Sequence, residues 1–254
     1  MAKFFVYGGL LFPADALSVL HNEIEAIRRE AGYQPGDEFK FDTHARPEQV
    51  SVEAATEAKR KVIDLCSGCG CKFIVHVILH EIIANQDSDQ QVQWAADYVI
   101  GGFNRYLAEV NDDGICIVDN LPNRSEFRYL SDKFAHGLRL DAGTTVALDR
   151  IKLFGSTCLG ASHANSAMDI VLGSFRYCIN SPRNLEAARE MLKQVVRLMW
   201  HMRSGDRVSV RGRGLILRPE IADIRVDEYK REYEELIEHL KSLFPGEGSE
   251  SEAS

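Results

Sequence analysis

The sequence predicts an α/β fold in which a mixed sheet is flanked by helices. Short apolar runs that suit strands alternate with segments whose apolar residues recur at helical spacing. The chain has 254 residues, 45% of them hydrophobic, which is enough for one large domain with a sizeable core. We place this domain at residues 1–180, a C-terminal helix-hairpin-helix extension at 181–245, and a disordered acidic tail at 246–254.

Apolar spacing and helix breakers define the expected elements of the first half. Pro13 introduces the first helix and Gly32 ends it. Gly8 and Gly9 lie within the first strand, where they indicate a twist, a bulge or a close approach of two backbones. The expected elements are a strand over residues 3–12, helices over 14–31 and 47–65, and a strand over 72–80.

The second half continues the alternation of helices and strands. Its most regular helix follows His163, and a glycine-containing turn at 212–214 separates two short apolar runs. The expected elements are helices over residues 90–110, 125–138, 163–179, 185–202 and 227–244, strands over 114–119 and 151–154, and a hairpin that pairs 207–211 with 215–217.

The composition favours a cytoplasmic protein without a membrane span. No apolar run approaches the roughly 20 residues that a transmembrane helix needs. The first residues lead directly into a predicted strand, so we expect no signal peptide. Cys116, Cys158 and Cys178 lie in apolar surroundings that are typical of buried, reduced thiols.

A cysteine cluster offers one possible zinc site. Cys66, Cys69 and Cys71 have a spacing that can chelate zinc, and His76 or His80 could complete the site. However, both histidines lie in a predicted strand that carries them away from the cysteines, and there is no second Cys-x-x-Cys motif. A glycine-rich turn between helix and strand is the favoured interpretation.

The charge is distributed unevenly along the chain. The net charge of −8 argues against binding nucleic acid through bulk charge. Nevertheless, nine arginines lie between residues 176 and 218, whereas the segment after residue 218 is acidic. From this segment we expect four arginines to hold a nucleic-acid backbone by salt-dependent phosphate contacts, namely Arg207, Arg211, Arg213 and Arg218.

Asp119 is the strongest candidate for a metal-binding carboxylate. It ends the apolar run 114–119, which we expect to be a strand buried on both faces. Ligands of α/β sheets usually bind at the carboxyl ends of strands, and Mg²⁺ or Mn²⁺ prefers oxygen ligands. The alternative is that Asp119 and Asn120 only open a turn.

Asp169 is a second candidate, near the start of a predicted helix. Gly173 follows one turn later on the same helical face. A glycine beside an acid leaves room for a metal ion, a water molecule or a phosphate. The structural alternative is that Asp169 stabilises the helix dipole.

Glu38, Lys40 and His163 complete the candidate set. Glu38 and Lys40 point to the same side of an extended segment, so they suit either a surface ion pair or a metal ligand beside a phosphate-binding cation. His163 suits either a helix cap or a proton carrier. The chain has neither a Gly-x-Ser-x-Gly elbow nor a P-loop, which argues against a serine hydrolase and a P-loop nucleotidase.

In their order along the chain, these motifs resemble the DUF3800 family, whose members are similar to small RNase H-like nucleases. The likeness covers roughly residues 3–180. Residues 4–10 match the family's second strand, 38–40 its Glu-x-Lys loop, 118–119 the strand that ends in Asp, and 167–173 its late helix. The resemblance implies a Mg²⁺ or Mn²⁺ site formed by Glu38, Asp119 and Asp169.

The resemblance departs from the family at one place. The family's Asp-Glu-Ser strand should precede Phe4, where this chain has three residues. A late start site, a shortened chain or a variant without catalysis would each explain this.

We therefore carry three hypotheses. The first is a metal-dependent nuclease in which Glu38, Lys40, Asp119, Asp169 and His163 are catalytic. The second is an inactive nuclease-like module that binds nucleic acid or a protein partner. The third is a protein with a structural metal in the cysteine cluster.

Overall fold

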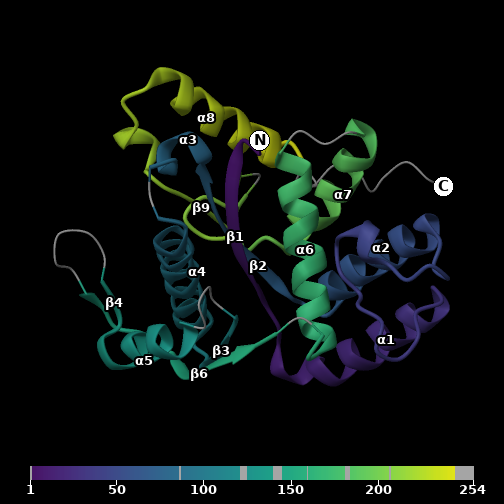
Figure 1. Cartoon of the computed structure of the whole chain (residues 1–254). Helices are drawn as coiled ribbons and strands as arrows, with labels where there is room; N and C mark the ends of the chain where they lie inside the picture. Colours follow the sequence, from purple (N-terminus) through teal and green to yellow (C-terminus); the bar gives the residue numbers. More distant parts are fainter. Residues whose placement is uncertain are drawn as a thin grey trace.

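The computed structural model describes residues 2–85, 87–120, 125–139, 145–158, 160–180, 184–205 and 207–243, without the side chain of Arg207. The protein is mixed α/β, with 55% helix, 19% strand and small mixed sheets (Figure 1). The acidic tail expected at 246–254 lies outside the described residues.

A three-stranded mixed sheet forms the centre of the molecule. It consists of β1 (Phe4–Leu11), β2 (Lys72–Leu79) and β9 (Leu215–Leu217), with β2 in the middle. β1 runs antiparallel to β2 over its whole length, and β9 runs parallel to β2. The side chain of Asn180 bonds both the N–H and the C=O of Phe4, at 2.7 and 3.0 Å, and so completes the first rung on the outer edge of β1.

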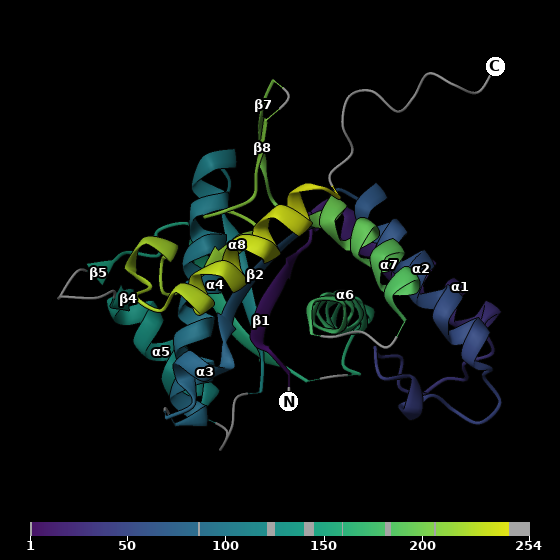
Figure 2. The same cartoon turned by 90° about the horizontal axis from the view of Figure 1, so that it is seen from above.

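Two helices cover the faces of this sheet. α4 (Ser88–Val110) lies on one side and α6 (His163–Ile179) on the other (Figure 2). A Cβ atom on Gly9 would lie 3.0 Å from Val99 of α4, and one on Gly8 would lie 3.0 Å from Leu172 of α6. The two glycines therefore let a helix approach each face, which agrees with the predicted close approach.

Further helices form an outer layer. α1 (Leu17–Glu30), α2 (Val52–Gly68) and α7 (Leu185–Leu198) pack beyond α6, as Figure 2 shows. α3 (His80–Ile83) follows directly after β2, and α8 (Asp227–Lys241) crosses one end of the sheet.

The C-terminal segment shares its core with the rest of the chain. Leu192 of α7, Leu215 of β9 and Tyr233 of α8 are buried in one cluster with Phe73 and Phe175. The Tyr233 hydroxyl accepts a bond from the N–H of Leu79 at 3.0 Å and donates to the C=O of Arg218 at 3.1 Å. Residue 180 is therefore not a boundary between two cores.

The predicted hairpin of 207–211 and 215–217 is wrong. β8 (Arg207–Ser209) pairs instead with β7 (Met202–Ser204), and this short hairpin projects from the molecule (Figure 2). β9 joins β2, where the N–H of Val75 also donates to the C=O of Gly214 at 2.8 Å. The reason is burial: all three residues of β9 are apolar and gain most in the core, whereas β7 is exposed.

A second, two-stranded sheet carries Asp119. β3 (Gly114–Asp119) runs parallel to β6 (Ile151–Thr157), and α5 (Glu126–His136) packs on β6. The prediction that β3 is buried on both faces is wrong, because Ile115 and Ile117 are 60% and 53% exposed. Within the described part of the chain, α4 covers one face of β3 and no element covers the other.

Local differences from the predicted boundaries have identifiable causes. α2 begins at Val52 because the Ser51 hydroxyl accepts the N–H of Ala54 at 3.1 Å and caps the helix. β6 extends to Thr157, because each of its residues from Leu153 to Thr157 pairs with β3. A further pair of two-residue strands joins β4 (Leu138–Arg139) to β5 (Thr145–Val146).

The predictions about membrane-spanning helices and about buried cysteines can also be compared with the structure. None of the described helices is long and apolar enough to cross a membrane. Cys178 is buried and Cys116 partly buried, but Cys158 is exposed, since it follows the end of β6.

Candidate functional site

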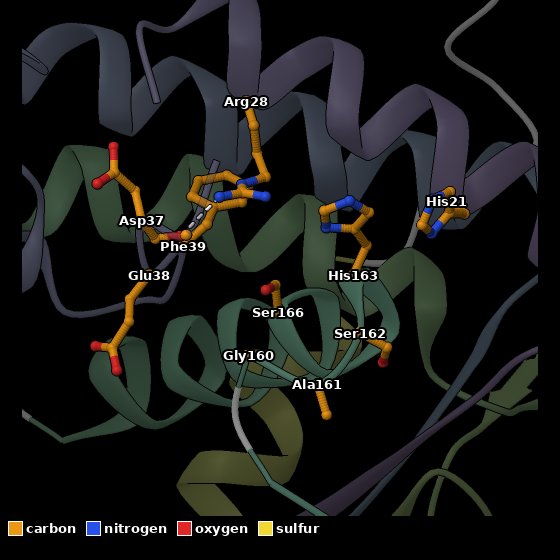
Figure 3. Close-up of a pocket in the computed structure, with 11 residues that line it drawn as sticks. His21, Arg28, Asp37, Glu38, Phe39, Gly160, Ala161, Ser162, His163 and Ser166 are labelled. Atoms are coloured by element: carbon orange, nitrogen blue, oxygen red, sulfur yellow. Dashed lines mark hydrogen bonds between the residues drawn. The ribbon is translucent and has the colours of Figure 1, made fainter. Parts of the chain in front are cut away.

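A pocket of about 260 Å³ lies between α1, the loop 36–39 and the beginning of α6 (Figure 3). It contains two of the predicted site residues, Glu38 and His163. The complete lining consists of His21, Arg28, Gly36, Asp37, Glu38, Phe39, Gly160, Ala161, Ser162, His163 and Ser166.

The beginning of α6 is held by side-chain hydrogen bonds. The Ser162 hydroxyl accepts the N–H of Asn165 at 3.2 Å and caps the helix. The amide of Asn165 donates to the Thr157 hydroxyl at 2.8 Å and to the C=O of Cys158 at 2.6 Å. His163, the first residue of α6, therefore has a fixed position at the end of β6.

α1 supplies a polar stripe that faces His163. His21, Glu25 and Arg28 are spaced four and three residues apart, which places them on one helical face. Glu25 Oε2 lies 3.2 Å from His163 Nε2 and 3.1 Å from Arg28 Nη1. The imidazole rings of His21 and His163 have their centroids 4.7 Å apart.

The electrostatics of the pocket favour a neutral His163. Burial lowers the pKa of His163, and the charges of Arg28 and His21 add to this effect, while Glu25 opposes it. Figure 3 shows the Asp37 and Glu38 carboxylates together on one side, away from the two imidazoles. The imidazole side of the pocket thus combines Arg28 with two histidine rings, and Glu25 pairs with both Arg28 and His163.

The sequence analysis missed His21 and Arg28. Their spacing with Glu25 could have indicated a polar face on the first helix. That face alone does not indicate a site, however, since most polar helical faces are simply solvated. Only the approach of α6 makes them part of a pocket.

The loop 36–41 places Glu38 and Lys40 beside α6. Lys40 Nζ lies 2.6 Å from Glu38 Oε2, and this hydrogen bond raises the pKa of Lys40. Asp169 Oδ2 accepts the N–H of Phe41 at 2.7 Å. Glu38, Lys40 and Asp169 are therefore neighbours, and Asp169 has a structural role in holding the loop.

A buried lysine supports the same loop from α2. Lys59 Nζ donates to the C=O of Phe41 and to the Thr43 hydroxyl, both at 2.7 Å. Burial lowers the pKa of Lys59 to about 8. This lysine has a close hydrogen-bond partner on each side, so we assign it to positioning the loop.

Two expectations about Asp169 need correction. It lies beyond the first turn of α6, where the helix dipole has little effect. The room beside Gly173 is not available to a ligand, because a Cβ atom there would lie 2.4 Å from Cγ of Phe41. The glycine instead admits the ring of Phe41.

Asp119 stands apart from the pocket. It is exposed at the end of β3, and its Oδ1 accepts the N–H of Asn120 at 2.8 Å. Residues 121–124, which include the Pro122 of the turn alternative, lie outside the described residues. Burial raises the pKa of Tyr7 to about 12, with smaller contributions from Cys116 and Asp119, so Asp119 is near β1.

The carboxylates do not form a common metal site in this arrangement. Among the described residues, no three His, Cys, Asp or Glu side chains are grouped closely enough to hold a metal ion. Glu38 is bonded to Lys40, Asp169 to Phe41 and Asp119 to Asn120. The residues therefore do not fit the Mg²⁺ or Mn²⁺ centre that the sequence predicts.

The cysteine cluster does not complete a zinc site either. Cys66 and Cys71 are buried free thiols that share a hydrogen bond, while Cys69 is a free thiol that is partly exposed. His76 lies in β2 and stacks on Tyr98, and His80 begins α3. The strand carries both histidines away from the thiols, as the favoured interpretation expected.

Three of the four predicted nucleic-acid-binding arginines have acidic partners. Arg211 Nη2 lies 2.8 Å from Glu220 Oε2, and Arg218 is paired with the same carboxylate. Arg213 Nη2 lies 3.5 Å from Glu109 Oε2. The side chain of Arg207 is outside the described atoms.

Comparison with known proteins supplies no relative. No family model, no curated protein and no solved structure matches the chain.

Proposed function

We propose that this protein is a nuclease-related module with RNase H-like layering that binds the phosphodiester backbone of nucleic acid. The observation that carries the proposal is the pocket at the beginning of α6, where Arg28 and two imidazoles gather. The layering is supported by the mixed sheet between α4 and α6 and by the strand that ends in Asp119.

The pocket has the physical properties of a phosphate site. The first N–H groups of a helix point towards its N-terminus, and the helix dipole favours an anion there. Arg28 adds a permanent positive charge beside Glu25, and protonation of His163 would add a second positive charge. The hydroxyls of Ser162 and Ser166 supply further hydrogen bonds at the same wall.

Binding of a fluorescein-labelled single-stranded oligonucleotide, followed by anisotropy in EDTA, tests this proposal. We expect the double variant His21→Ala/His163→Ala to bind about tenfold more weakly, a loss of about 1.4 kcal/mol. His239→Ala, on α8 at a distance from the pocket, is the matched control. Equal affinity of the double variant and the wild type would refute the pocket as the binding site.

The pH dependence gives a second readout of the same experiment. Since the pKa of His163 is lowered, the folded protein gains this charge only below the ordinary histidine range near 6.5. We therefore expect affinity to rise as the pH falls below about 6.5. The rise should be absent from the double variant and present in His239→Ala.

A second candidate function is Mg²⁺- or Mn²⁺-dependent cleavage of DNA or RNA. It is favoured by the position of Lys40, which is bonded to Glu38 and lies in the field of Asp169. Metal-dependent cleavage requires Asp119 to lie beside the carboxylates of Glu38 and Asp169. Among the described residues, these three side chains are not grouped closely enough to hold a metal ion.

Cleavage assays with labelled DNA and RNA distinguish the two candidates. Cleavage that needs Mg²⁺ or Mn²⁺ and is lost in Asp119→Asn would establish the enzyme. Oligonucleotide binding without cleavage, with or without these ions, would leave the binding module as the function.

A further inference from the structure

Two arginines lie over the ring of one buried tryptophan, on the side of the sheet that α4 covers. A third arginine lies over Tyr98, and a fourth shares the carboxylate of Glu220 with it. Trp200 is 4% exposed. Arg105 comes from α4, Arg211 and Arg213 lie between β8 and β9, and Arg218 follows β9. We name these four side chains the arginine cluster. Arg105 was not among the residues that the sequence analysis selected.

Aromatic rings hold three of these guanidinium groups in place. Cζ of Arg105 lies 5.3 Å from the ring centroid of Trp200, and Cζ of Arg213 lies 5.7 Å from it. Arg218 lies over Tyr98 at 4.8 Å. The indole is itself fixed by an edge contact with Tyr106 at 5.4 Å. The guanidinium planes are therefore ordered before any ligand arrives.

The cluster carries more positive charge than its neighbours neutralise. Glu220 is shared by Arg211 and Arg218, and Glu109 pairs with Arg213. Arg105 has no ion pair within the described part of the chain and donates instead to the C=O of Gly212. Four guanidinium groups thus face two carboxylates.

The surroundings of Arg105 disfavour its charged form. Burial lowers the pKa of Arg105, and repulsion from Arg213 lowers it further, only partly offset by Glu109. Arg213 Nε is buried and has no hydrogen-bond partner among the described atoms. The repulsion between Arg105 and Arg213 would be relieved by a bound anion.

We propose that the arginine cluster is a second contact surface for the sugar-phosphate backbone of single-stranded nucleic acid. The proposal rests on the proposed function but concerns another surface. The pocket is lined in part by residues of α6, and the cluster includes Arg105 of α4. Figure 2 shows these two helices on opposite sides of β1 and β2.

The chemistry of the cluster selects phosphate among anions. A guanidinium group carries two parallel N–H groups that match two phosphate oxygens. Several ordered guanidinium groups on one surface suit a polymer that carries one negative charge per nucleotide. A nucleobase could also stack on the outer face of a stacked arginine.

The test measures salt-dependent binding of the same labelled single-stranded oligonucleotide to the full chain. We expect Arg105→Gln to weaken binding about five- to tenfold. The slope of log K against log salt should become smaller by about one. Arg105→Lys keeps the positive charge but loses the paired N–H groups of the guanidinium. Its affinity should therefore lie between those of the wild type and Arg105→Gln, with the salt slope of the wild type. Arg128→Gln on exposed α5 is the matched control, and equal melting temperatures establish that each variant is folded.

Every outcome decides the question. If the pocket variant loses binding while Arg105→Gln and Arg213→Gln bind as the wild type does, the cluster proposal fails and the proposed function stands. If the wild type binds no oligonucleotide, both fail. Tighter binding of a doubly phosphorylated peptide than of the oligonucleotide would overturn nucleic acid as the ligand of the cluster.

Discussion

Strands β2 and β3 are both short apolar segments that end near polar residues, yet they differ in how deeply they are buried. Seven of the eight residues of β2 are buried, whereas only Val118 is buried in β3. β2 has a strand on each edge and a helix on each face, while β3 has β6 on one edge and α4 on one face. Apolar composition therefore indicates a strand, and its neighbours decide how deeply it is buried.

The same contrast applies to polar residues in the two strands. His76 of β2 is 0% exposed, and within the described structure neither ring nitrogen has a hydrogen-bond partner. Asp119 of β3 remains in solvent and bonds to the next residue of the chain. The central sheet tolerates an unpaired histidine because the rings of Tyr98 and Trp94 pack around it.

The largest expected effect comes from opening a cavity in β2. Phe73 is 0% exposed and packs edge-on against Phe175, with ring centroids 5.7 Å apart. Phe73→Ala should reduce the free energy of unfolding by about 3–5 kcal/mol, measured by urea denaturation. A loss below about 1 kcal/mol would show that the central sheet is not packed as described.

A pH-dependent effect of intermediate size is expected from His76. Burial lowers its pKa to about 3, and the nearby charge of Arg218 contributes. Between about pH 6.5 and 3 the unfolded chain binds a proton that the folded chain does not, so stability is lost as the pH falls through this window.

The variant His76→Phe should remove this pH dependence and keep the aromatic packing. Between pH 7 and pH 5, we expect the unfolding free energy of the variant to improve relative to the wild type by about 2 kcal/mol. His136→Phe, at an exposed histidine of α5, is the control and should show no such trend. A constant difference between His76→Phe and wild type at both pH values would contradict the assignment.

The smallest effect is expected on the open face of β3. Ile117→Thr replaces a half-exposed residue by another that suits a strand, so the unfolding free energy should change by less than about 0.5 kcal/mol. Urea denaturation beside Phe73→Ala gives the direct comparison. A loss of about 2 kcal/mol or more would mean that this face is covered, and that the contrast with β2 is mistaken.

Much of the local structure was predictable from the sequence. α6 begins at His163 and ends at Ile179 as expected, because a serine cap precedes a strongly apolar helix. β1, β2 and β3 were also expected near their observed limits. Residues 207–217 were not, since a local glycine turn suggested a hairpin while β9 gained more by pairing with β2.

The candidate site was predictable only in part. Glu-x-Lys spacing placed Glu38 beside Lys40, and Asp169, which was expected to share a site with Glu38, lies near the same lysine. No local pattern could reveal that α1 brings His21 and Arg28 to the same place. The predicted gathering of Asp119 with the other carboxylates depended on sheet order, which a short strand does not encode.

The sequence by itself determined the α/β class, the positions of most helices and strands, and the residue types available for phosphate binding. These depend on periodicity, capping and charge, which act over a few residues. Tertiary structure alone decided that one face of β3 stays open, that β9 enters the central sheet, and that Arg105 stacks on Trp200. Such outcomes depend on competition for burial between segments far apart in the chain. A local sequence pattern does not show which of these segments becomes buried.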